Sequence, residues 1–564
     1  MEKLKIAFFD LTGCEGCEFH LLSLNEHLLD LFQDFEITHW RLLSQNEESD
    51  FDVALIEGAV TTREHIRLLK KIRQTSKIVV AIGACAISGN VFAQIPENQR
   101  PKLASKIYNR NYQLKAKFLE PVKKFIKVDK TIPGCPPDLT KFKKFIQSLK
   151  KEKITSKIQS VKPPDYVAKI EGHGQLKVNF VQKKAVFRVE ESERLIEGLL
   201  LGKNFQAAPF INARICGICP VAHNLCSWKA IENALDLEIS LETRLLREIY
   251  LAAQMIKSHL LHLFFLVLPD FAKVKSSIEL SQKYPAEFHL MLNIKRVSEK
   301  VLHLVGGSNT FPTNTTLAGF IKPPERDEFF KLRPEIDDVV DEAHDLINLF
   351  AKLPFPKFES QLQFLTTQPF SGDYPLYQSR VPPEIKEMIS HDSTAKIGLL
   401  PNGKIVKVGA LARLTHYADL LNPKAGKALT EKPFSYTNPY HNNLAQTIEI
   451  LHFLETIQKT TDLLLKGNLE KARGLSLFKP HKKVEGQACL EAPRGILIHQ
   501  IRLSPKGKIE DYNIIPPTQI NLASLEAEAQ QFISQAISRN QSKLKQDLEK
   551  LIRAFDPCIT CAVH

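Results

Sequence analysis

Short apolar runs alternate with amphipathic stretches over the first 150 residues. The apolar runs have the length of buried strands and lie at residues 5–9, 53–56 and 78–82, with a fourth ending near Ile132. Residues 19–32 and 64–73 instead space their apolar side chains as helices do. Such alternation is typical of a parallel sheet covered by helices, so we expect an α/β, flavodoxin-like open sheet in residues 1–150.

The pattern changes after residue 150. Residues 149–164 are polar and Lys-rich and end in Pro163-Pro164, which predicts a linker at residues 151–165. Beyond it, residues 245–268 are apolar on nearly all faces, as in the core helix of a large bundle. Further helices are predicted at 328–353, 442–465 and 522–555, and short strands at 178–189 and 397–408. We therefore expect residues 166–564 to form a large, mainly α-helical domain with small β elements.

Charge and hydropathy narrow the function. The formal net charge is +13, which fits nucleic acid, a membrane surface or an acidic protein as partner. Lys and Arg are spread along the chain without a basic block interleaved with aromatic residues, so we expect no nucleic-acid binding. The N-terminus lacks a signal pattern, and the most apolar stretch, residues 260–269, is about half as long as a membrane span. We expect a cytoplasmic protein without direct membrane insertion.

Four of the ten cysteines lie in the N-terminal region. Each cysteine segment follows the end of a predicted strand, and the residues are Cys14, Cys17, Cys85 and Cys135. Because the carboxyl ends of parallel strands meet at one edge of a sheet, these thiols should converge there. Four thiolates suffice for a 4Fe–4S cluster. A zinc site, or a Cys14/Cys17 redox pair with two core cysteines, remains open on spacing alone.

Two more C-x-x-C pairs lie more than three hundred residues apart. Cys216 and Cys219 form the first pair, and Cys558 and Cys561 form the second. A zinc ribbon joins its pairs over a loop of roughly 15–20 residues, so a whole folded domain is needed to bring these pairs together. Soft thiolates suit nickel, iron, copper(I) and zinc, and structural zinc is the commonest such site. The cysteines alone therefore leave the metal open.

The residues around the cysteines resemble nickel–iron hydrogenases. The segments R-I-C-G-I-C-P-V-A-H at 214–223 and D-P-C-I-T-C-A-V-H at 556–564 are similar to the large subunit of the cytoplasmic, cofactor-coupled type. The segments around the N-terminal cysteines, together with I-E-G-A-V at 56–60, resemble the small subunit and the related cluster subunit of respiratory complex I. The resemblance implies both subunits fused in one chain.

The resemblance also implies the ligands. All four cysteines of the C-x-x-C pairs would bind nickel; Cys219 and Cys561 would bridge to an iron carrying carbon monoxide and cyanide, and His223 would hydrogen-bond a bridging thiolate. The four N-terminal cysteines would hold a 4Fe–4S cluster. No cysteine lies between residues 135 and 216, so the chain is expected to carry one such cluster, where many small subunits carry three.

Other segments follow the same family order. Glu171, in K-I-E-G-H with Lys169 in place of Arg, would relay protons from the terminal ligand Cys558. Arg494, in E-A-P-R-G, would lie over the metals, and Asp556 of the last motif is a further candidate catalytic residue. Considered individually, Glu171 and Glu197 suit surface ion pairs and Arg494 a solvated position.

A second metal is implied near the C-terminus. Glu197, in R-L-I-E, and His564 would hold a magnesium-type (or iron) ion. The chain ends at His564, where the family's maturation protease leaves its product, so this end is either processed or encoded.

One segment departs from the family, because Phe311 precedes Pro312 where relatives carry His.

The implied activity is reversible heterolytic oxidation of dihydrogen to protons and electrons. The first proton acceptor would be Cys558, with Arg494 as the second candidate, and Glu171 would pass the proton outward. Electrons would leave through the single cluster to an external redox protein of the ferredoxin or flavoprotein type. The alternatives are a dihydrogen sensor, the hydrogenase module of a membrane-bound energy-converting complex, and a structural zinc protein. No oligomeric state follows from the sequence.

Overall fold

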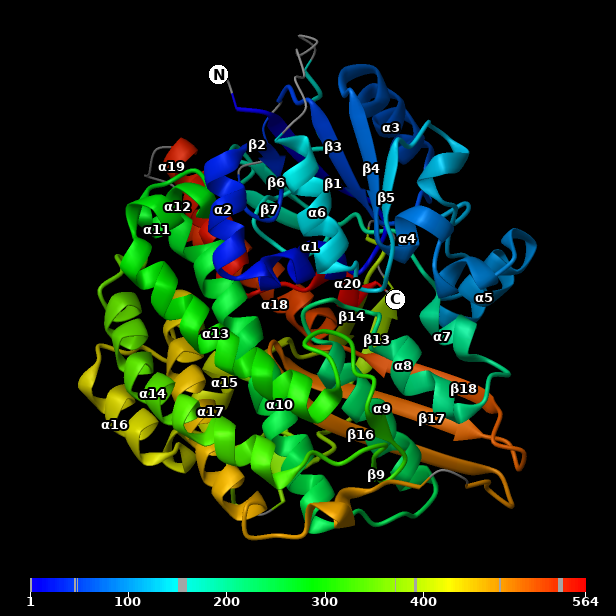
Figure 1. Cartoon of the computed structure of the whole chain (residues 1–564), viewed down its shortest axis with the longest axis vertical. Helices are drawn as coiled ribbons and strands as arrows, with labels where there is room; N and C mark the ends of the chain where they lie inside the picture. The colour runs from blue at the N-terminus through cyan, green and yellow to red at the C-terminus, as the bar shows by residue number, and fades with distance from the viewer. Residues whose placement is uncertain are drawn as a thin grey trace.

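The computed structural model describes residues 3–44, 47, 49–150, 160–370, 372–389, 393–475, 478–535 and 541–563. Most of the predicted linker, residues 151–159, and the predicted ligand His564 lie outside these residues. The N-terminal sheet is at the top right of Figure 1, a layer of long helices is on the left, and a second sheet is at the lower right.

The N-terminal part contains a five-stranded parallel sheet. Its strands are β1 (Lys5–Asp10), β2 (Glu36–Trp40), β3 (Val53–Glu57), β4 (Ile78–Ile82) and β5 (Lys130–Ile132), in the order β2-β1-β3-β4-β5. This 2-1-3-4-5 order is a common one for doubly wound sheets. The helices of this part are α1 (Gly16–Leu21), α2 (Glu26–Asp34), α3 (Arg63–Thr75), α4 (Gly83–Ser88), α5 (Arg100–Ile107) and α6 (Leu139–Leu149).

Two details of this part differ from the sequence prediction. The edge strand β2 was not predicted, because its polar residues break the apolar run expected of a buried strand. The predicted helix at 19–32 is two helices, since Asn25 adopts a left-handed φ of 53° between α1 and α2. The break turns the chain between the helix that carries Cys17 and the helix that covers the sheet.

The helical layer is built around α10 (Leu241–Leu261), which packs against α13 (Pro285–Gly306) and α17 (Asn442–Leu464). α14 (Arg326–Ala351) packs against α17 from outside. These helices confirm the core helix and the long helices predicted from periodicity. The predicted helix at 522–555 is described as two, α18 (Pro517–Gln535) and α19 (Gln541–Ala554), with residues 536–540 outside the described residues.

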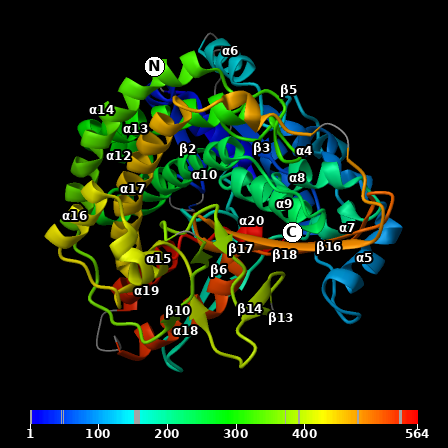
Figure 2. The same ribbon diagram turned by 90° about the horizontal axis from the view of Figure 1, so that it is seen from below.

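A three-stranded antiparallel sheet was not predicted. It consists of β16 (Val484–Ala492), β17 (Gly495–Leu503) and β18 (Ile509–Ile515). The helix α9 (Pro220–Ala234) lies across it, as Figure 2 shows from below. The predicted short strands at 178–189 and 397–408 correspond to β6 (Gly174–Asn179), β7 (Lys184–Val189), β14 (Lys396–Leu399) and β15 (Val406–Lys407).

Shorter elements complete the described chain. The helices are α7 (Ile196–Leu200), α8 (Ala208–Asn212), α11 (Leu268–Ala272), α12 (Ser277–Lys283), α15 (Ala410–Tyr417), α16 (Pro423–Glu431) and α20 (Ile559–Ala562). The strands are β8 (Thr315–Thr316), β9 (Gly319–Phe320), β10 (Gln363–Phe364), β11 (Gln368–Pro369), β12 (Ser379–Arg380) and β13 (Lys386–Ile389).

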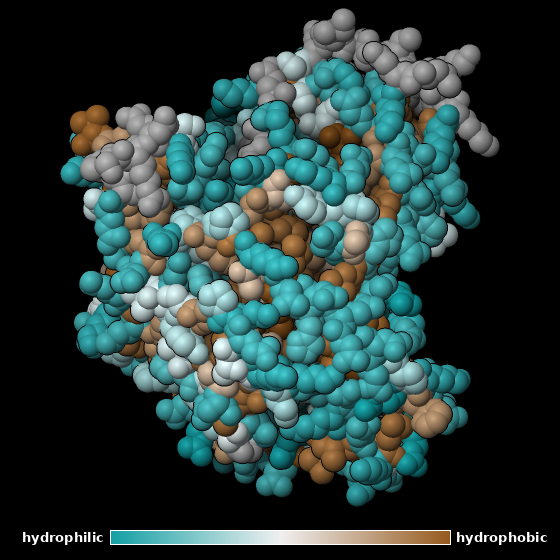
Figure 3. Space-filling view, turned by 90° about the vertical axis from the view of Figure 1, so that its left-hand side faces the viewer, coloured by the Kyte–Doolittle hydropathy of each residue, from teal (hydrophilic) through white to brown (hydrophobic). Residues whose placement is uncertain are grey.

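One hydrophobic core runs through both parts of the chain. It includes Phe19 and Leu55 from the N-terminal part together with Met255 and Cys558 from the rest. By length and composition, the helical segment Leu241–Ala272 could cross a bilayer, but its apolar window is completely buried inside the protein, as in a core helix. The outer face of the helical layer is mostly hydrophilic, with apolar residues showing in patches (Figure 3).

Candidate metal centres

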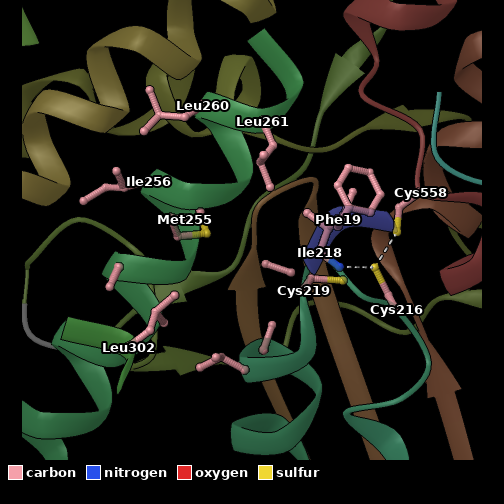
Figure 4. Packing of buried hydrophobic residues seen from close by; sticks show 14 of the residues in the cluster. Phe19, Cys216, Ile218, Cys219, Met255, Ile256, Leu260, Leu261, Leu302 and Cys558 are labelled. Carbon is pink, nitrogen blue, oxygen red and sulfur yellow. Dashed lines mark hydrogen bonds between the residues drawn. The ribbon is translucent and has the colours of Figure 1, made fainter. Parts of the chain in front are cut away.

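The two distant C-x-x-C pairs meet in the interior. Cys219 precedes the first turn of α9, and Cys558 precedes α20. The four sulfurs lie within 4.8 Å of one another, and all four cysteines are buried. The Sγ atoms of Cys216 and Cys558 are 3.0 Å apart, and those of Cys219 and Cys561 are 3.3 Å apart. Figure 4 shows the first of these pairs beside Phe19 of α1.

Arg194 holds the two cysteine loops together. Its guanidinium donates to the carbonyls of Arg214 (2.9 Å) and Ile215 (2.7 Å), just before Cys216. It also donates to the carbonyl of Thr560 at 2.8 Å, just before Cys561. A single buried side chain therefore fixes both ligand loops, which the sequence alone did not indicate.

The four-thiol site fits a soft metal. The sulfurs converge from two loops, and thiolates are ligands that favour soft metals. Burial raises the pKa of three of these thiols, because a lone thiolate is costly away from water. Burial also disfavours the charged form of Cys216, but hydrogen bonds from the other three cysteines lower its pKa. The geometry by itself suits zinc as well as nickel.

Glu171 lies against the second pair. Its backbone forms a β-bridge with Cys558, and its carboxylate accepts hydrogen bonds from the backbone N–H of Thr560 (3.0 Å) and from the Thr560 hydroxyl. Burial, and next the Cys216 thiolate, raise the pKa of Glu171 to about 8. The carboxyl is therefore fully buried rather than part of a surface ion pair.

Arg494 is held by Asp556, two residues before Cys558. Its guanidinium donates to the Asp556 carboxylate (2.6 Å), to the Asp556 carbonyl (2.9 Å) and to the Ser258 hydroxyl (3.0 Å). Although burial disfavours its charge, Asp556 and the nearby thiolates raise the pKa of Arg494. Gln446 donates to the other Asp556 oxygen at 3.0 Å. Arg494 is thus a buried, permanently charged group rather than a solvated one.

His223 approaches a predicted bridging ligand. Its Nε2 is 3.5 Å from Cys561 Sγ, and its Nδ1 is 3.2 Å from Nε2 of His499. Glu197 is also buried and accepts a hydrogen bond from the Ile514 backbone N–H at 3.0 Å. Its predicted partner His564 lies outside the described residues, so the second metal site stays a prediction.

The four N-terminal cysteines gather at the carboxyl edge of the parallel sheet. Asn90 Nδ2 reaches both Cys85 Sγ (3.6 Å) and Cys135 Sγ (3.5 Å). Gly83 has a φ of +78°, and a Cβ there would lie 2.3 Å from Cys17 Sγ. Burial raises the pKa of Cys14 and of Cys17. The converging thiols and the close glycine are a cradle of the kind that a cluster needs.

The spacing of these sulfurs differs from that of the other four. Within the described part of the chain, no three of them lie within 4.8 Å of one another. A single zinc ion at about 2.3 Å from each ligand would hold its sulfurs roughly 3.8 Å apart. The wider arrangement fits a polynuclear cluster better than one ion.

The two cysteine sites touch through their backbones. The N–H of Gly217 donates to the carbonyl of Cys14 at 2.7 Å, and a Cβ on Gly217 would lie 2.2 Å from the Cα of Gly16. Phe311, where the sequence departs from the family, is buried against Cys14. The guanidinium carbon of Arg214 lies 5.1 Å from the centre of its ring, so a cation–π contact occupies this position.

A buried ion cluster joins the N-terminal part to the rest. His173 contacts the carboxylates of Asp10 (2.8 Å) and Glu191 (2.8 Å). Arg41 pairs with Asp10 (2.6 Å) and with Glu15. Burial lowers the pKa of His173, but the two carboxylates outweigh it and raise that pKa to about 9. Because each of the three carboxylates already contacts Arg41 or His173, this cluster serves better as an ionic junction than as a cation site.

Lys and Arg are less evenly spread along the chain than the sequence analysis expected. Residues 100–150 contain fourteen Lys and Arg but three Asp and Glu, against a net charge of +13 for the whole chain. Eleven of these cations are exposed, and Asp138 is the single exposed acid. The same segment holds Cys135, which is less buried than Cys14, Cys17 and Cys85. The positive charge therefore concentrates in the segment that contains Cys135.

Two protein families match the chain in sequence. Residues 14–149 match the family described as NADH ubiquinone oxidoreductase, 20 Kd subunit. Residues 194–320 and 402–564, just over half of the chain, match the family described as nickel-dependent hydrogenase. Both matches include the cysteines assembled above.

Individual relatives agree with the second match. Sulfhydrogenase 1 subunit alpha of Pyrococcus furiosus is 32% identical in an alignment 425 residues long that covers 71% of this chain and 97% of the relative. The subunit beta of the NAD-reducing hydrogenase HoxS of Cupriavidus necator is 26% identical, over 71% of this chain and 94% of the relative.

Solved structures share the fold. An NAD⁺-reducing [NiFe]-hydrogenase in the H₂-reduced state aligns with a TM-score of 0.63 at 22% identity, over 71% of this chain and 98% of that one. The Ni-Fe-Se hydrogenase of D. vulgaris Hildenborough aligns with a TM-score of 0.57 at 21% identity, over the same shares. At these identities the likeness shows the fold of the matched part alone.

Proposed function

The chain belongs to the nickel-dependent hydrogenase family, and on that premise we propose that it catalyses the reversible heterolytic oxidation of dihydrogen. The observation that carries the proposal is the convergence of Cys216, Cys219, Cys558 and Cys561 within 4.8 Å in a buried site. When bound, a nickel–iron centre with carbon monoxide and cyanide on its iron would supply Lewis-acid and redox chemistry, and a 4Fe–4S cluster would supply one-electron transfer.

Within this proposal, Cys558 is the better first proton acceptor. Arg494 is held by three hydrogen bonds, and its pKa is raised, so removing its proton is costly. Its fixed positive charge instead favours negative charge on the neighbouring thiolates. Asp556 orients Arg494 through both its carboxylate and its carbonyl. The acceptor is thus the thiolate, and Arg494 is an electrostatic stabiliser.

Glu171 is the proposed next carrier. Its backbone pairs with Cys558, and Thr560 fixes its carboxylate with two donors, so the group is held beside the ligand loop in one orientation. A carboxyl whose pKa is raised to about 8 can exist in both protonation states near neutral pH. These properties suit a group that takes a proton from the cysteine site and releases it outward.

The proposed electron exit is the cluster held by Cys14, Cys17, Cys85 and Cys135. The Gly217–Cys14 hydrogen bond supports this route, because it joins the two ligand loops without an intervening side chain. With one cluster, electrons must pass to another protein. We propose an acidic redox protein, of ferredoxin or flavoprotein type, docked on the basic surface of residues 100–150 near Cys135.

Three further parts of the proposal rest on the family resemblance. Glu197 and His564 would hold a magnesium-type ion beside the last cysteine motif. Residues 1–150 and 166–564 would correspond to the small and large subunits, with residues 151–165 as the linker. The chain would act in the cytoplasm without inserting into a membrane itself.

The deciding experiment combines metal analysis with infrared spectroscopy and dye-linked turnover of the purified full-length protein. We expect nickel and iron, infrared bands from carbon monoxide and cyanide, and dihydrogen-dependent dye reduction. Zinc without nickel would overturn the proposal. The same bands with negligible turnover would favour a dihydrogen sensor, and co-purification with integral membrane subunits would favour an energy-converting complex.

A further inference from the structure

A chain of hydrogen bonds runs from a predicted bridging ligand into the C-terminal sheet. Cys561 Sγ is 3.5 Å from His223 Nε2, and His223 Nδ1 is 3.2 Å from His499 Nε2. His499 Nδ1 is 2.8 Å from the Tyr512 hydroxyl. The family resemblance accounts for the first contact, but it assigns nothing to His499 or Tyr512.

The series of hydrogen bonds continues beyond Tyr512 to Ser227 and Asn212. The Tyr512 hydroxyl is 2.8 Å from Ser227 Oγ, and Asn212 Nδ2 donates to Ser227 Oγ at 3.3 Å. His223 and Ser227 lie one turn apart on α9, whereas His499 and Tyr512 lie on the neighbouring strands β17 and β18. The relay thus joins a helix to the sheet beneath it, and its side chains are buried.

The donor and the acceptor of each hydrogen bond can be assigned by starting from Cys561 at one end of the series. As a metal-bound thiolate Cys561 would have no proton and could only accept, so His223 Nε2 would carry the hydrogen. In neutral imidazole the other nitrogen is then an acceptor, so His223 Nδ1 accepts from His499 Nε2–H. His499 Nδ1 in turn accepts from the Tyr512 hydroxyl.

Starting from Asn212, at the other end of the series, gives the same donors and acceptors. Asn212 uses its amide N–H on Ser227 Oγ, which leaves the Ser227 hydrogen available to the Tyr512 oxygen. Burial raises the pKa of Tyr512, so the phenol keeps its proton and can donate it to His499. Every hydrogen bond in the series from Asn212 to Cys561 then has its donor on the Asn212 side, with no position where two donors face each other.

We propose that His499 and Tyr512 are positioning residues that fix the tautomer of His223, so that its Nε2–H is held on the Cys561 thiolate. The inference rests on the proposed function, since it requires a metal-bound thiolate at residue 561. Neither residue touches the cysteines. They act through His223, as outer partners of metal ligands generally do.

The hydrogen bond has an electronic consequence. A donor aimed at a thiolate withdraws electron density from the sulfur and weakens its donation to the metal. Less donation to iron means less back-donation into bound carbon monoxide, and hence a higher stretching frequency. Losing the donor should therefore lower the carbon monoxide frequency, while a purely structural defect that leaves the site loaded should not.

Four variants of the full-length, metal-loaded protein test whether His499 and Tyr512 position His223. Tyr512→Phe removes the hydroxyl that sets His499, and His499→Leu removes the donor to His223. His499→Gln keeps a donor at Nε2 and an acceptor at Oε1. Tyr440→Phe is the matched control, because it deletes a buried hydroxyl that donates to the Asp547 carbonyl (2.8 Å), far from this relay in the sequence. The readouts are the infrared bands and the nickel electron paramagnetic resonance signal.

We expect the carbon monoxide band to move to lower frequency in Tyr512→Phe and His499→Leu, and to return close to the wild-type position in His499→Gln. Tyr440→Phe should match the wild type. Unchanged bands in Tyr512→Phe would overturn the inference even if His499→Leu fails to fold, and so would equal shifts in Tyr440→Phe. A wild-type protein without carbon monoxide and cyanide bands would overturn the proposed function, and the inference with it.

Discussion

The backbone N–H of Gly217 donates a 2.7 Å hydrogen bond to the carbonyl of Cys14. Gly217 lies between the first pair of buried cysteines, and Cys14 begins the N-terminal set, so two ligand loops from different parts of the fold are joined directly. The approach is close enough that a Cβ on Gly217 would lie 2.2 Å from Gly16 Cα. Glycine is required here by space, and the contact lies on the electron route proposed above.

Replacing Gly217 with alanine should separate the two loops. Backbone atoms surround the position, so the added methyl cannot be relieved by a rotamer change, and we expect destabilisation of about 1–3 kcal/mol or more. Reduction of the cluster by dihydrogen should slow as the loops part. Thermal unfolding and the rate of cluster bleaching under dihydrogen measure the two effects.

Gly426 provides the control for this change. It lies in α16, and a Cβ added at this position would have its nearest neighbouring atom 3.9 Å away. Gly426→Ala should leave both the unfolding temperature and the bleaching rate near wild type. Equal behaviour of the two variants would contradict a steric role for Gly217.

Replacing Glu171 with glutamine should interrupt proton transfer without removing the metals. The amide keeps the size of the side chain and can still accept a hydrogen bond from Thr560, but it cannot carry a proton. We expect hydrogen–deuterium exchange to fall by about a hundredfold or more, with nickel content and infrared bands retained. Thr560→Ser, which keeps the hydroxyl donor, should remain close to wild type. Full exchange activity in Glu171→Gln would exclude the relay role.

The cysteine sites could be predicted from sequence because their signals are local. C-x-x-C spacing and the ends of apolar strands are visible in short windows. Arg194, Thr560 and His499 carry no such signal, since each acts on a residue brought near only by the fold. Their roles depend on long-range contacts such as the Arg194–Thr560 hydrogen bond, which joins residues more than three hundred positions apart.

The missed β elements have a different physical reason. The apolar runs of β16 and β17 are short, and such runs do not distinguish a strand from a buried helix. The segment S-P-K-G-K at 504–508, between two apolar runs, is nonetheless a hairpin signal that could have identified β17 and β18. The helix break at Asn25 has no comparable signal in its own segment, and its side chain accepts a hydrogen bond from Lys295, 270 positions away in the sequence.

Stability should depend on pH through His173. Its pKa is raised from 6.5 to about 9 in the folded protein. A raised pKa contributes stability that is fully present below pH 6.5 and is lost as pH rises toward 9, in total on the order of 3 kcal/mol. The unfolding-temperature difference between wild type and His173→Gln should therefore be largest near pH 6 and shrink by pH 9.5. A difference that is constant with pH would mean that His173 is not charged in its ion cluster.

Charge reversal on the basic surface should weaken electron transfer to an acidic partner. Lys123, Lys127 and Lys141 are exposed, and they flank Cys135 in sequence. Changing all three to Glu should raise the apparent KM for an acidic ferredoxin by on the order of tenfold or more, and should reduce the salt dependence of the rate. Turnover with a small neutral dye should not change, because the dye needs no docking surface.

The control for charge itself is a second triple variant. Lys331, Lys352 and Lys357 are also exposed, lie outside residues 100–150 and change the net charge equally when replaced by Glu. If the partner recognises the local surface, this variant should keep nearly wild-type kinetics with ferredoxin. If both triple variants weaken electron transfer equally, net charge alone governs association and the docking site does not lie beside Cys135. The comparison thus separates long-range steering, which any surface cation supports, from a specific encounter at the cluster.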